Sequence, residues 1–233
     1  MIDLHSHILP QMDDGSKSPE ESAALLELLH QQGVTTVVAT PHFYATEETP
    51  QVFLKRREES AARLLPATNT QPQSLMGAEV AYFSGIGNCE DIIPLQIQNT
   101  KRILIEMPFC TWSPRMVEEI CRIPMQLGLI PVLAHVNRYR HRGQFPTYMQ
   151  TLAEQGVLFQ CNAEAFHTLA GRRWAVKLAK SGLLHFLGSD CHDLIERPPQ
   201  LLQGTQIMKK RLSPTAWDLW NNSISDLLFS NGL

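Results

Sequence analysis

The chain lacks the features of several protein classes. No apolar run reaches the roughly 18 residues of a membrane-spanning helix. The first candidate strand begins at Ile2, so we expect no signal peptide. The net charge of −3 lacks the basic excess of a nucleic-acid binder. The five cysteines form no CxxC pair, which argues against a disulfide framework or a thiolate zinc site. We therefore expect a cytoplasmic protein without a membrane span or a nucleic-acid partner.

What the sequence does contain is a regular alternation of apolar runs and amphipathic stretches. Ser18-Pro19-Glu20-Glu21 predicts a helix start, because serine caps a helix, proline fits its first turn and glutamate suits the third position. Gly33 predicts the end of this helix. Further helical patterns are clearest at 51–65, 114–127, 146–155 and 172–181. The stretch 66–73 is predicted to be a surface loop.

Seven apolar runs between these helices predict strands. They are 2–6, 35–40, 75–80, 102–106, 131–135, 157–161 and 184–189. Alternating strands and helices imply a parallel sheet. We predict a single α/β domain over residues 1–233, with a distorted seven-stranded (β/α) barrel, because the polar residues of interest follow six of the seven strands and do not cluster at one switch point.

Nine imidazole and carboxylate side chains lie at or just beyond the ends of these strands. They are His5, His7, Asp14, His42, Glu79, Glu106, His135, Asp190 and His192. In a parallel β/α fold the carboxyl ends of the strands meet on one face. Burying so many polar groups there is costly unless metal ions hold them. The sequence therefore predicts a multinuclear site, whose mixed ligands suit manganese, iron(II) or zinc.

Two pairs of these residues are spaced for a shared ligand site. His5 and His7 are two positions apart on a strand, as are Asp190 and His192 on an extended segment, so each pair faces one side. The same spacing turns Cys191 away from the ligands. No metal role is expected for the remaining histidines, which are His30, His141, His167 and His185.

Loop residues complete the predicted site. Asp13-Asp14-Gly15 has the composition of a turn that presents Asp14, and either carboxylate can reach a cation. Arg138 and Arg197 follow two of the strand ends, and their guanidinium groups suit phosphate oxygens. The positive charge of three divalent ions would exceed the negative charge of the four candidate carboxylate ligands. The resulting positively charged pocket would suit the hydrolysis of a phosphate ester. The predicted catalytic residues are Arg138, Arg197 and Asp14.

At this point the motifs resemble a known family. MIDLHSHILP with DDG, VVATPH, GAEV, LIE, AHxxRY and SDxHxxxxRPP resemble the PHP superfamily. They are most similar to the manganese-dependent bacterial protein tyrosine phosphatases of the CpsB/CapC type, from capsule and exopolysaccharide gene clusters. The resemblance runs from Met1 to Pro199.

The resemblance implies a distorted barrel with three metal ions, manganese foremost. It assigns His5, His7, Glu79 and Asp190 to one ion, Glu79, Glu106 and His135 to the second, and Asp14, His42 and His192 to the third. Arg138 and Arg197 match the phosphate-binding arginines of the family. The implied reaction is attack of a metal-bridging hydroxide on phosphorus without a phosphoenzyme. The implied substrate is a phosphotyrosine protein, such as the tail of a bacterial tyrosine kinase.

Three positions depart from the family pattern. Val136-Asn137 replaces Pro-Glu, Gln11-Met12 replaces Gly-Ile, and Ala81 stands where a basic residue is common. None of the candidate metal ligands is affected. The departures therefore concern substrate preference and not hydrolysis.

There are three other interpretations of the sequence, of which one keeps the metal-dependent phosphatase chemistry and two replace it. A PHP phosphatase acting on histidinol phosphate or a nucleotide would share the fold. Cys191 to Arg197 has the C-x5-R spacing of cysteine-dependent tyrosine phosphatases, but the intervening HDLIE has no glycine and two acids, which do not suit a phosphate cradle. A non-catalytic metal-stabilised scaffold would predict a gap in the ligand set, and none is found.

The C-terminal stretch 213–230 has a helical apolar stripe. It is formed by Trp217, Trp220, Ile224, Leu227 and Leu228. We expect this stripe to pack on the outside of the barrel, with an oligomer contact as the alternative.

Overall fold

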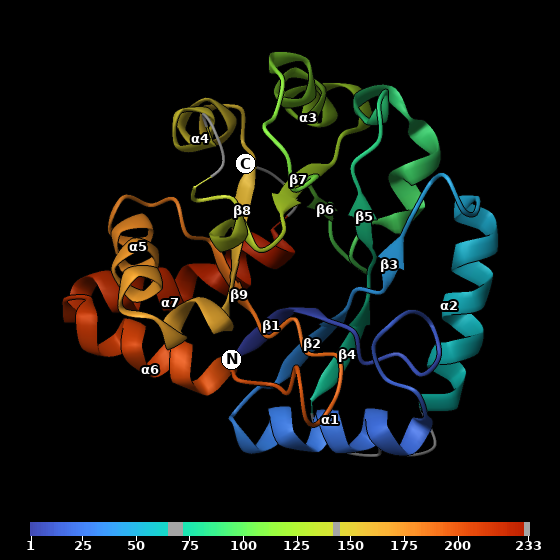
Figure 1. Cartoon of the computed structure of the whole chain (residues 1–233), viewed down its shortest axis with the longest axis horizontal. Coiled ribbons are helices and arrows are strands. Elements are labelled where there is room, and N and C mark those ends of the chain that lie inside the picture. Colours follow the sequence, from blue (N-terminus) through green and yellow to red (C-terminus); the bar gives the residue numbers. More distant parts are fainter. Residues whose placement is uncertain (65–71, 142–144, 231–233) are drawn as a thin grey trace.

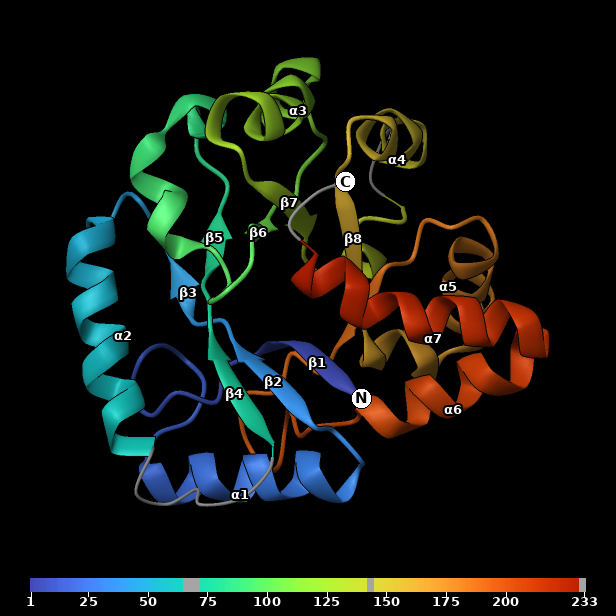
Figure 2. The same cartoon turned by 180° about the vertical axis from the view of Figure 1, so that it is seen from behind.

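A curled parallel sheet forms the centre of the computed structural model, which describes residues 1–64, 72–141 and 145–230 (Figures 1 and 2). One part of it has the strand order β1 (Ile2–Ser6), β2 (Thr36–Ala39) and β4 (Gln73–Met76). The other has the order β3 (His42–Phe43), β5 (Glu79–Ala81), β6 (Arg102–Glu106), β7 (Ile130–Leu133), β8 (Leu158–Asn162) and β9 (Phe186–Gly188). Every strand pair is parallel, as the alternation of β and α predicted.

Each predicted strand is present, but one is followed by an additional short strand and another is divided in two. The run at 35–40 forms β2 and, beyond Pro41, continues as β3. The run at 75–80 is divided between β4 and β5 by Gly77 and Ala78. Proline has no N–H for the ladder, and a Cβ at Gly77 would come within 3.2 Å of Ile97 Cγ1, so close packing bends the chain at these points. The predicted count of seven strands was therefore inexact.

The first and last strands of the sheet lie side by side. The His7 N–H donates to Cys191 O at 2.9 Å, and the Asp190 N–H donates to His5 O at 2.8 Å. These bonds join the segment after β9 to the end of β1, so that the sheet curls round on itself. The carboxyl ends of the strands consequently face a common opening.

Helices surround this sheet (Figures 1 and 2). They are α1 (Pro19–Gln31), α2 (Pro50–Leu64), α3 (Pro114–Leu127), α4 (Phe145–Glu154), α5 (Leu169–Lys180), α6 (Leu201–Arg211) and α7 (Pro214–Phe229). Short 3₁₀ turns lie at Ile86–Asn88, Glu90–Leu95, Val136–Arg138 (η4) and Ala163–His167 (η5). Ser18 caps α1 by accepting from the Glu21 N–H at 3.2 Å, as predicted. Of the predicted loop at 66–73, residues 66–71 lie outside the described residues, and Gln73 instead begins β4.

Two apolar layers lie on opposite faces of the sheet. Ile103 and Ile105 of β6 pack in the larger cluster together with the helices, whereas Leu104 belongs to a second cluster on the inside of the curl. Leu228 of α7 is fully buried in this inner cluster. The Trp220 indole N–H donates to Leu184 O at 2.7 Å. The C-terminal stripe therefore packs against the barrel, although it reaches the inner layer and not only the outer wall.

Among the described residues, no helix is both long and apolar enough to cross a membrane.

Candidate metal centre

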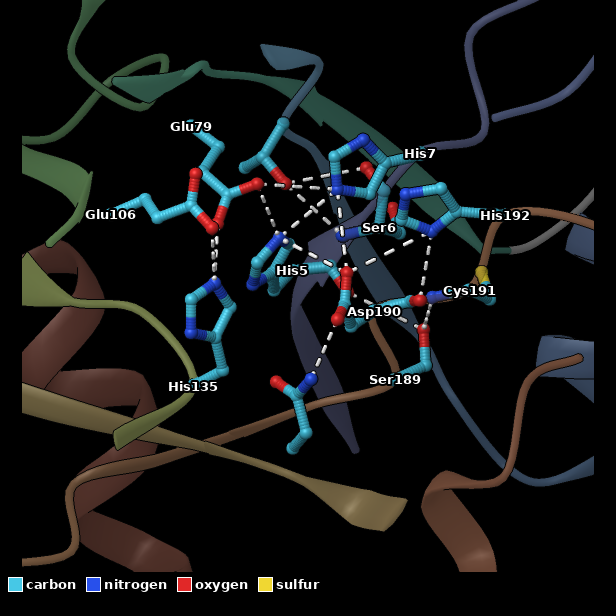
Figure 3. A network of polar contacts seen from close by, with 12 residues as sticks. His5, Ser6, His7, Glu79, Glu106, His135, Ser189, Asp190, Cys191 and His192 are labelled. Carbon is cyan, nitrogen blue, oxygen red and sulfur yellow. Dashed lines mark hydrogen bonds and ion pairs between the residues drawn. The ribbon is translucent and has the colours of Figure 1, made fainter. Parts of the chain in front are cut away.

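All nine candidate ligands meet at the carboxyl ends of the strands (Figure 3 labels seven of them). At the centre, the Nε2 atoms of His5 and His7 lie 3.1 Å apart. Glu79 Oε2 is 3.2 Å from the first ring nitrogen and 3.4 Å from the second. Asp190 Oδ1 is 3.5 and 3.4 Å from the same two atoms. Two imidazoles and two carboxylates thus point into one small volume.

The remaining residues extend this centre in two directions. On one side, His135 Nε2 lies 3.0 Å from Glu79 Oε1 and 3.1 Å from Glu106 Oε1. On the other side, Asp14 Oδ1 lies 3.3 Å from His192 Nε2 and 3.5 Å from His42 Nε2. Glu79 Oε2 also lies 3.0 Å from His42 Nδ1. Glu79 therefore occupies the middle of the whole cluster, where one carboxylate can serve two ions.

Eight of the nine candidate ligands fall into three groups of metal-binding dimensions, within which all ligand atoms lie within 4.8 Å of one another. These groups are His5, His7 and Asp190; His42, Glu79 and Glu106; and His7, Asp14, His42 and His192. Their membership differs from the assignment by resemblance, because His7 and His42 each belong to two groups. Glu79 belongs to one group and not to two, and His135 belongs to none. Which ligand holds which ion remains a prediction.

Unpartnered polar atoms show that the donor set fits metal ions. Glu79 Oε2 and His42 Nδ1, although 3.0 Å apart, and His192 Nε2 are buried and make no hydrogen bond of normal geometry among the described residues. The facing Nε2 atoms of His5 and His7 have room for only one proton between them. Unpaired buried polar groups of this kind are costly in a native fold. A divalent cation bound at Nε2 and carboxylate oxygen atoms would satisfy the acceptors that face the centre.

A layer of supporting residues sets the tautomer of two of these rings. His7 Nδ1 donates to Asp13 Oδ2 at 2.7 Å, and Asp13 also accepts from the His42 N–H at 2.9 Å. His192 Nδ1 donates to Asp190 O at 3.0 Å. With the proton held on Nδ1, the Nε2 lone pair is free to bind a cation. Asp13 was one of two acidic candidates in the sequence, and the structure gives it this supporting position.

Strand β8, which contributes no candidate ligand, supplies two further supports. Gln160 Oε1 accepts from His5 Nδ1 at 3.3 Å and from the His135 N–H at 2.6 Å. Gln160 Nε2 donates to Asn162 Oδ1, and Asn162 Nδ2 donates to Asp190 Oδ2 at 2.6 Å. A Cβ at Gly188 would lie 2.5 Å from Gln160 Nε2, so only glycine leaves room for this amide. Neither residue was predicted to belong to the site, because only its polar character within an apolar strand distinguishes it.

The backbone is constrained at several site positions. Gly15 lies so close to His7 that a Cβ there would be 2.3 Å from His7 O, which explains the glycine of the DDG turn. His135 and Asp190 have positive φ angles of 31° and 52°, which are uncommon for residues other than glycine. Such strain is typical of functional sites, where the surrounding structure holds it in place.

The histidine pKa values differ between the two sides of the cluster. For His135, burial opposes protonation, but contacts with Glu106 and Glu79 outweigh it and raise the pKa to about 9. For His192, burial and the neighbouring His7 ring lower the pKa to about 4. The Glu79 pKa is held well below its usual value despite burial, because His5, His135 and His42 surround the carboxylate. The centre thus stabilises the deprotonated carboxylate that metal binding requires.

Both predicted arginines lie at the opening of the cluster. Arg138 Nη2 is 2.6 Å and Arg197 Nη2 is 2.9 Å from the same atom, Asp190 Oδ2. Arg138 also pairs with Glu164 of η5 at 3.2 Å, and Arg197 Nη1 is 3.8 Å from Asp14 Oδ2. Asp190 therefore offers one oxygen to the ring nitrogens and the other to the guanidinium groups. Their partial exposure leaves N–H donors available for an incoming anion.

Cys191 does not belong to this constellation. Its side chain is fully buried in the apolar layer and points away from the cluster (Figure 3). Burial and the nearby Asp3 raise the pKa of the thiol, which disfavours a thiolate nucleophile. The spacing from Cys191 to Arg197 is therefore no sign of cysteine-dependent phosphatase chemistry.

Two cavities of the described structure bear on the location of the site. A cavity of about 500 Å³ lies between α5 and α6, and none of the nine candidate ligands lines it. A cavity of about 240 Å³ adjoins the cluster and is lined by Met12, Asp13, Asp14, His42, Tyr44, Glu47, Glu48 and Arg56. Since chemistry requires the candidate ligands, the smaller cavity is the relevant one.

Comparisons with known proteins identify the family of the chain. Residues 1–224 match the family model described as capsular polysaccharide synthesis, CpsB/CapC. The chain is 32% identical to the tyrosine-protein phosphatase CpsB of Streptococcus pneumoniae, over 91% of this chain and 90% of that protein. It is 29% identical to the tyrosine-protein phosphatase YwqE of Bacillus subtilis, over 90% of this chain and 84% of that protein.

A solved structure has a closely similar fold. It comes from work on YwqE of Bacillus subtilis and CpsB of Streptococcus pneumoniae, which are described as metal-dependent tyrosine phosphatases. The TM-score is 0.84 at 25% identity, over 100% of this chain and 96% of that chain. A histidinol phosphate phosphatase from Lactococcus lactis has a TM-score of 0.51 at 12% identity, which shows a related fold alone.

Proposed function

The chain belongs to the CpsB/CapC family, and we propose that it is a metal-dependent phosphatase that hydrolyses phosphotyrosine in proteins. The observation that supports this most directly is the nine-residue cluster with its unpartnered acceptors and two arginines at its opening. Histidine and carboxylate ligands in this number suit two or more divalent ions. We propose three ions, with manganese as the native metal and iron or zinc as substitutes.

Divalent ions bound here would supply Lewis acidity, water of lowered pKa and compensation for phosphate charge. The side chains have separate tasks. His5, His7, His42, Glu79, Glu106, His135, Asp190, His192 and Asp14 would hold the ions. Arg138 and Arg197 would turn their free N–H donors toward the non-bridging phosphate oxygens and orient the ester. Asp14, between Arg197 and two imidazoles, would keep this arginine near the ions.

We propose a protein tail as the physiological substrate, in particular the tyrosine-phosphorylated tail of a bacterial kinase, and the reducing cytoplasm as the compartment. The relatives named as tyrosine-protein phosphatases support the first proposal, and five free cysteines support the second. Hydrolysis of histidinol phosphate or a nucleotide is the alternative that an experiment must separate. The related fold of a histidinol phosphate phosphatase does not by itself favour it.

A combined metal and substrate experiment tests the proposal. The purified protein is stripped by a chelator and reloaded with manganese, iron(II) or zinc. Turnover is then measured with a phosphotyrosine peptide, the same peptide with phosphoserine, and histidinol phosphate. We expect no activity in the stripped protein, best recovery with manganese, and fastest hydrolysis of the phosphotyrosine peptide. Full activity without metal, or fastest hydrolysis of histidinol phosphate, would contradict the proposal.

A further inference from the structure

Two partly exposed aromatic side chains stand at the edge of the metal cluster, and neither is used in the function proposed above. Tyr44 is 36% exposed and stacks on His42, with ring centroids 5.5 Å apart and planes 29° apart. Phe109 is 47% exposed and stacks on His135, with centroids 5.7 Å apart and planes 21° apart. Each ring thus covers one candidate ligand and leaves apolar surface open to solvent.

The two rings flank the centre of the cluster from different sides. Tyr44 follows the carboxyl end of β3, and Phe109 follows the carboxyl end of β6. Their stacking partners contact the two oxygens of one carboxylate. His42 Nδ1 lies 3.0 Å from Glu79 Oε2, and His135 Nε2 lies 3.0 Å from Glu79 Oε1. A phosphate ester bound over Glu79 would therefore have an aromatic side chain on either side of its leaving group.

Phe109 is held in place before any ligand arrives. Its ring stacks on Tyr139 as well, at 5.5 Å and 25°. Tyr139 is buried, donates its hydroxyl hydrogen to Met107 O at 2.6 Å, and packs edge-on against Trp112. The Trp112 indole N–H in turn donates to Pro108 O, which fixes the loop around Phe109. A side chain so supported loses little entropy when a second ring packs on it.

Packing on His135 and Tyr139 accounts for the position of one ring face of Phe109. It does not account for the exposure of the other face at the opening of a polar site. Single exposed apolar side chains are common on protein surfaces. Two aromatic rings stacked on two candidate ligands of one cluster are a more specific arrangement. Tyr44 also lines the 240 Å³ cavity that adjoins the cluster, and an apolar cavity of about 150 Å³ is large enough for benzene. The space beside Tyr44 is therefore large enough for a phenyl ring.

We propose that Tyr44 and Phe109 are the walls of a subsite that binds the phenyl ring of phosphotyrosine and so determines the preference for aryl over alkyl phosphates. The inference rests on the proposed function and deepens it. Aromatic pairs prefer offset-stacked or edge-to-face contacts, and both walls present an open ring face for one. An alkyl ester such as phosphoserine has no ring to occupy this subsite and gains nothing from the walls.

Substrate pairs measured with matched variants test the subsite. Phe109→Leu and Tyr44→Leu are compared with wild type on a phosphotyrosine peptide and on the same peptide with phosphoserine. The intrinsic leaving-group difference cancels, because each variant is compared with wild type on the same substrate. We expect kcat/KM to fall about 10-fold per wall for phosphotyrosine and less than about twofold for phosphoserine. Phe109→Tyr and Tyr44→Phe should retain the wild-type ratio.

Two controls separate substrate contact from support of the ligands. Phe229→Leu removes a phenyl ring of similar exposure, 40%, at the end of α7, and should change neither substrate. Metal content is measured for every variant, because Phe109 and Tyr44 stack on candidate ligands. Equal losses on both peptides, or losses that follow metal content, would show that the rings only support His135 and His42, and would overturn the proposal.

A binding measurement keeps the inference testable apart from hydrolysis. Benzylphosphonate and methylphosphonate are titrated calorimetrically into the metal-loaded protein. We expect benzylphosphonate to bind about 10-fold more tightly, and the Phe109→Leu/Tyr44→Leu double variant to bind both equally. If neither peptide is hydrolysed but this difference is found, the proposed function fails and the aromatic subsite stands. If the double variant retains the difference, the subsite is wrong whatever the enzyme hydrolyses.

Discussion

The metal cluster has a deep half and a rim half, and they are built differently. The deep half consists of His5, His7, Glu79, His135 and Asp190, whose side chains are at most 4% exposed. The rim half consists of Asp14, His42, Arg138 and Arg197, with exposures from 17% to 63%. Asp13, Gln160 and Asn162 fix three of the deep residues by buried hydrogen bonds. The rim residues are held mainly by ion pairs with one another and with deep residues.

This difference assigns different tasks to the two halves. A buried, hydrogen-bonded ligand has its geometry set before a metal arrives, which favours affinity and selectivity. A half-exposed arginine keeps donors available for a ligand that enters and leaves with each turnover. We therefore expect changes in the deep half to act through metal content, and changes in the two rim arginines to act through substrate.

The largest effect should come from the centre of the deep half. Glu79→Gln removes the charge that lies beside His5, His42 and His135. We expect loss of bound metal and a fall in kcat of more than about 1000-fold, because the two oxygens of this carboxylate lie at the centre of the ligand cluster. Asp14→Asn, at the exposed rim, should cost less than about 100-fold. Metal analysis and steady-state kinetics of both variants measure these effects. If Asp14→Asn lowers kcat as much as Glu79→Gln, the deep and rim halves do not differ in the way proposed.

The arginines should show the opposite behaviour. Arg197→Ala should lower kcat/KM about 10- to 100-fold and weaken inhibition by inorganic phosphate, the scale of one or two charge-assisted hydrogen bonds. Arg138→Ala should do the same, with a further small effect from its lost contact with Glu164. Metal content should stay at the wild-type level in both. An Arg197→Ala protein with normal kinetics would remove this arginine from the site.

A partly buried histidine away from the cluster provides a pH-dependent contrast with the metal site. His185 Nδ1 accepts from the Phe159 N–H at 3.0 Å, and burial lowers its pKa to about 4. The unfolded chain, with an ordinary pKa near 6.5, then binds the proton more readily. Stability from His185 is therefore full above pH 6.5 and is lost as the pH falls toward 4.

His185→Gln should abolish this sensitivity, since the amide oxygen can still accept from Phe159. Between pH 7.5 and 5 we expect wild type to lose about 2 kcal/mol of unfolding free energy relative to the variant. Urea unfolding of both proteins at each pH measures the difference. Effects of acid on the metal cluster cancel, because both proteins share it. Parallel pH profiles would show that His185 does not titrate in this range.

The supporting layer should give a smaller effect on metal affinity. Gln160→Leu leaves the His5 Nδ1 donor and the His135 N–H without their acceptor. We expect manganese affinity to fall about 10-fold, the lower end of the range for residues that orient metal ligands. Gln203→Leu, on an exposed position of α6, is the matched control. Competition with a coloured chelator provides the measurement, and unchanged affinity would show that the deep half does not need this support.

The smallest effect should come from Cys191. Cys191→Ser should keep activity within about twofold, because the side chain only packs in the apolar layer. Thiol alkylation should likewise spare an enzyme that chelation inactivates. A Cys191→Ser protein that is inactive with its metal intact would contradict the metal-dependent chemistry proposed here.

Much of the fold was predictable because its signals are local. The cap at Ser18, the helix over 114–127 and the strands at 2–6 and 102–106 agree with the structure at both ends or within a residue. Helix α6 was not predicted, since Gly204 and Thr205 weaken its periodicity. The structure explains Gly204 by packing, because a Cβ there would lie 3.1 Å from the Phe166 ring. A contact between segments so far apart in sequence leaves no local pattern.

The candidate site divides in the same way. The positions of the nine residues along the chain were enough to predict that their side chains meet, because strand ends of a parallel β/α fold share one face and these residues stand at or just beyond those ends. Their grouping depends on the three-dimensional fold, since the curl of the sheet and the bonds between β1 and the segment after β9 set distances between residues about 185 positions apart. It also decided that Gln160, Asn162, Tyr44 and Phe109 belong to the site. Their residue types are ordinary in strands and loops, and only their positions against His5, Asp190, His42 and His135 give them a role.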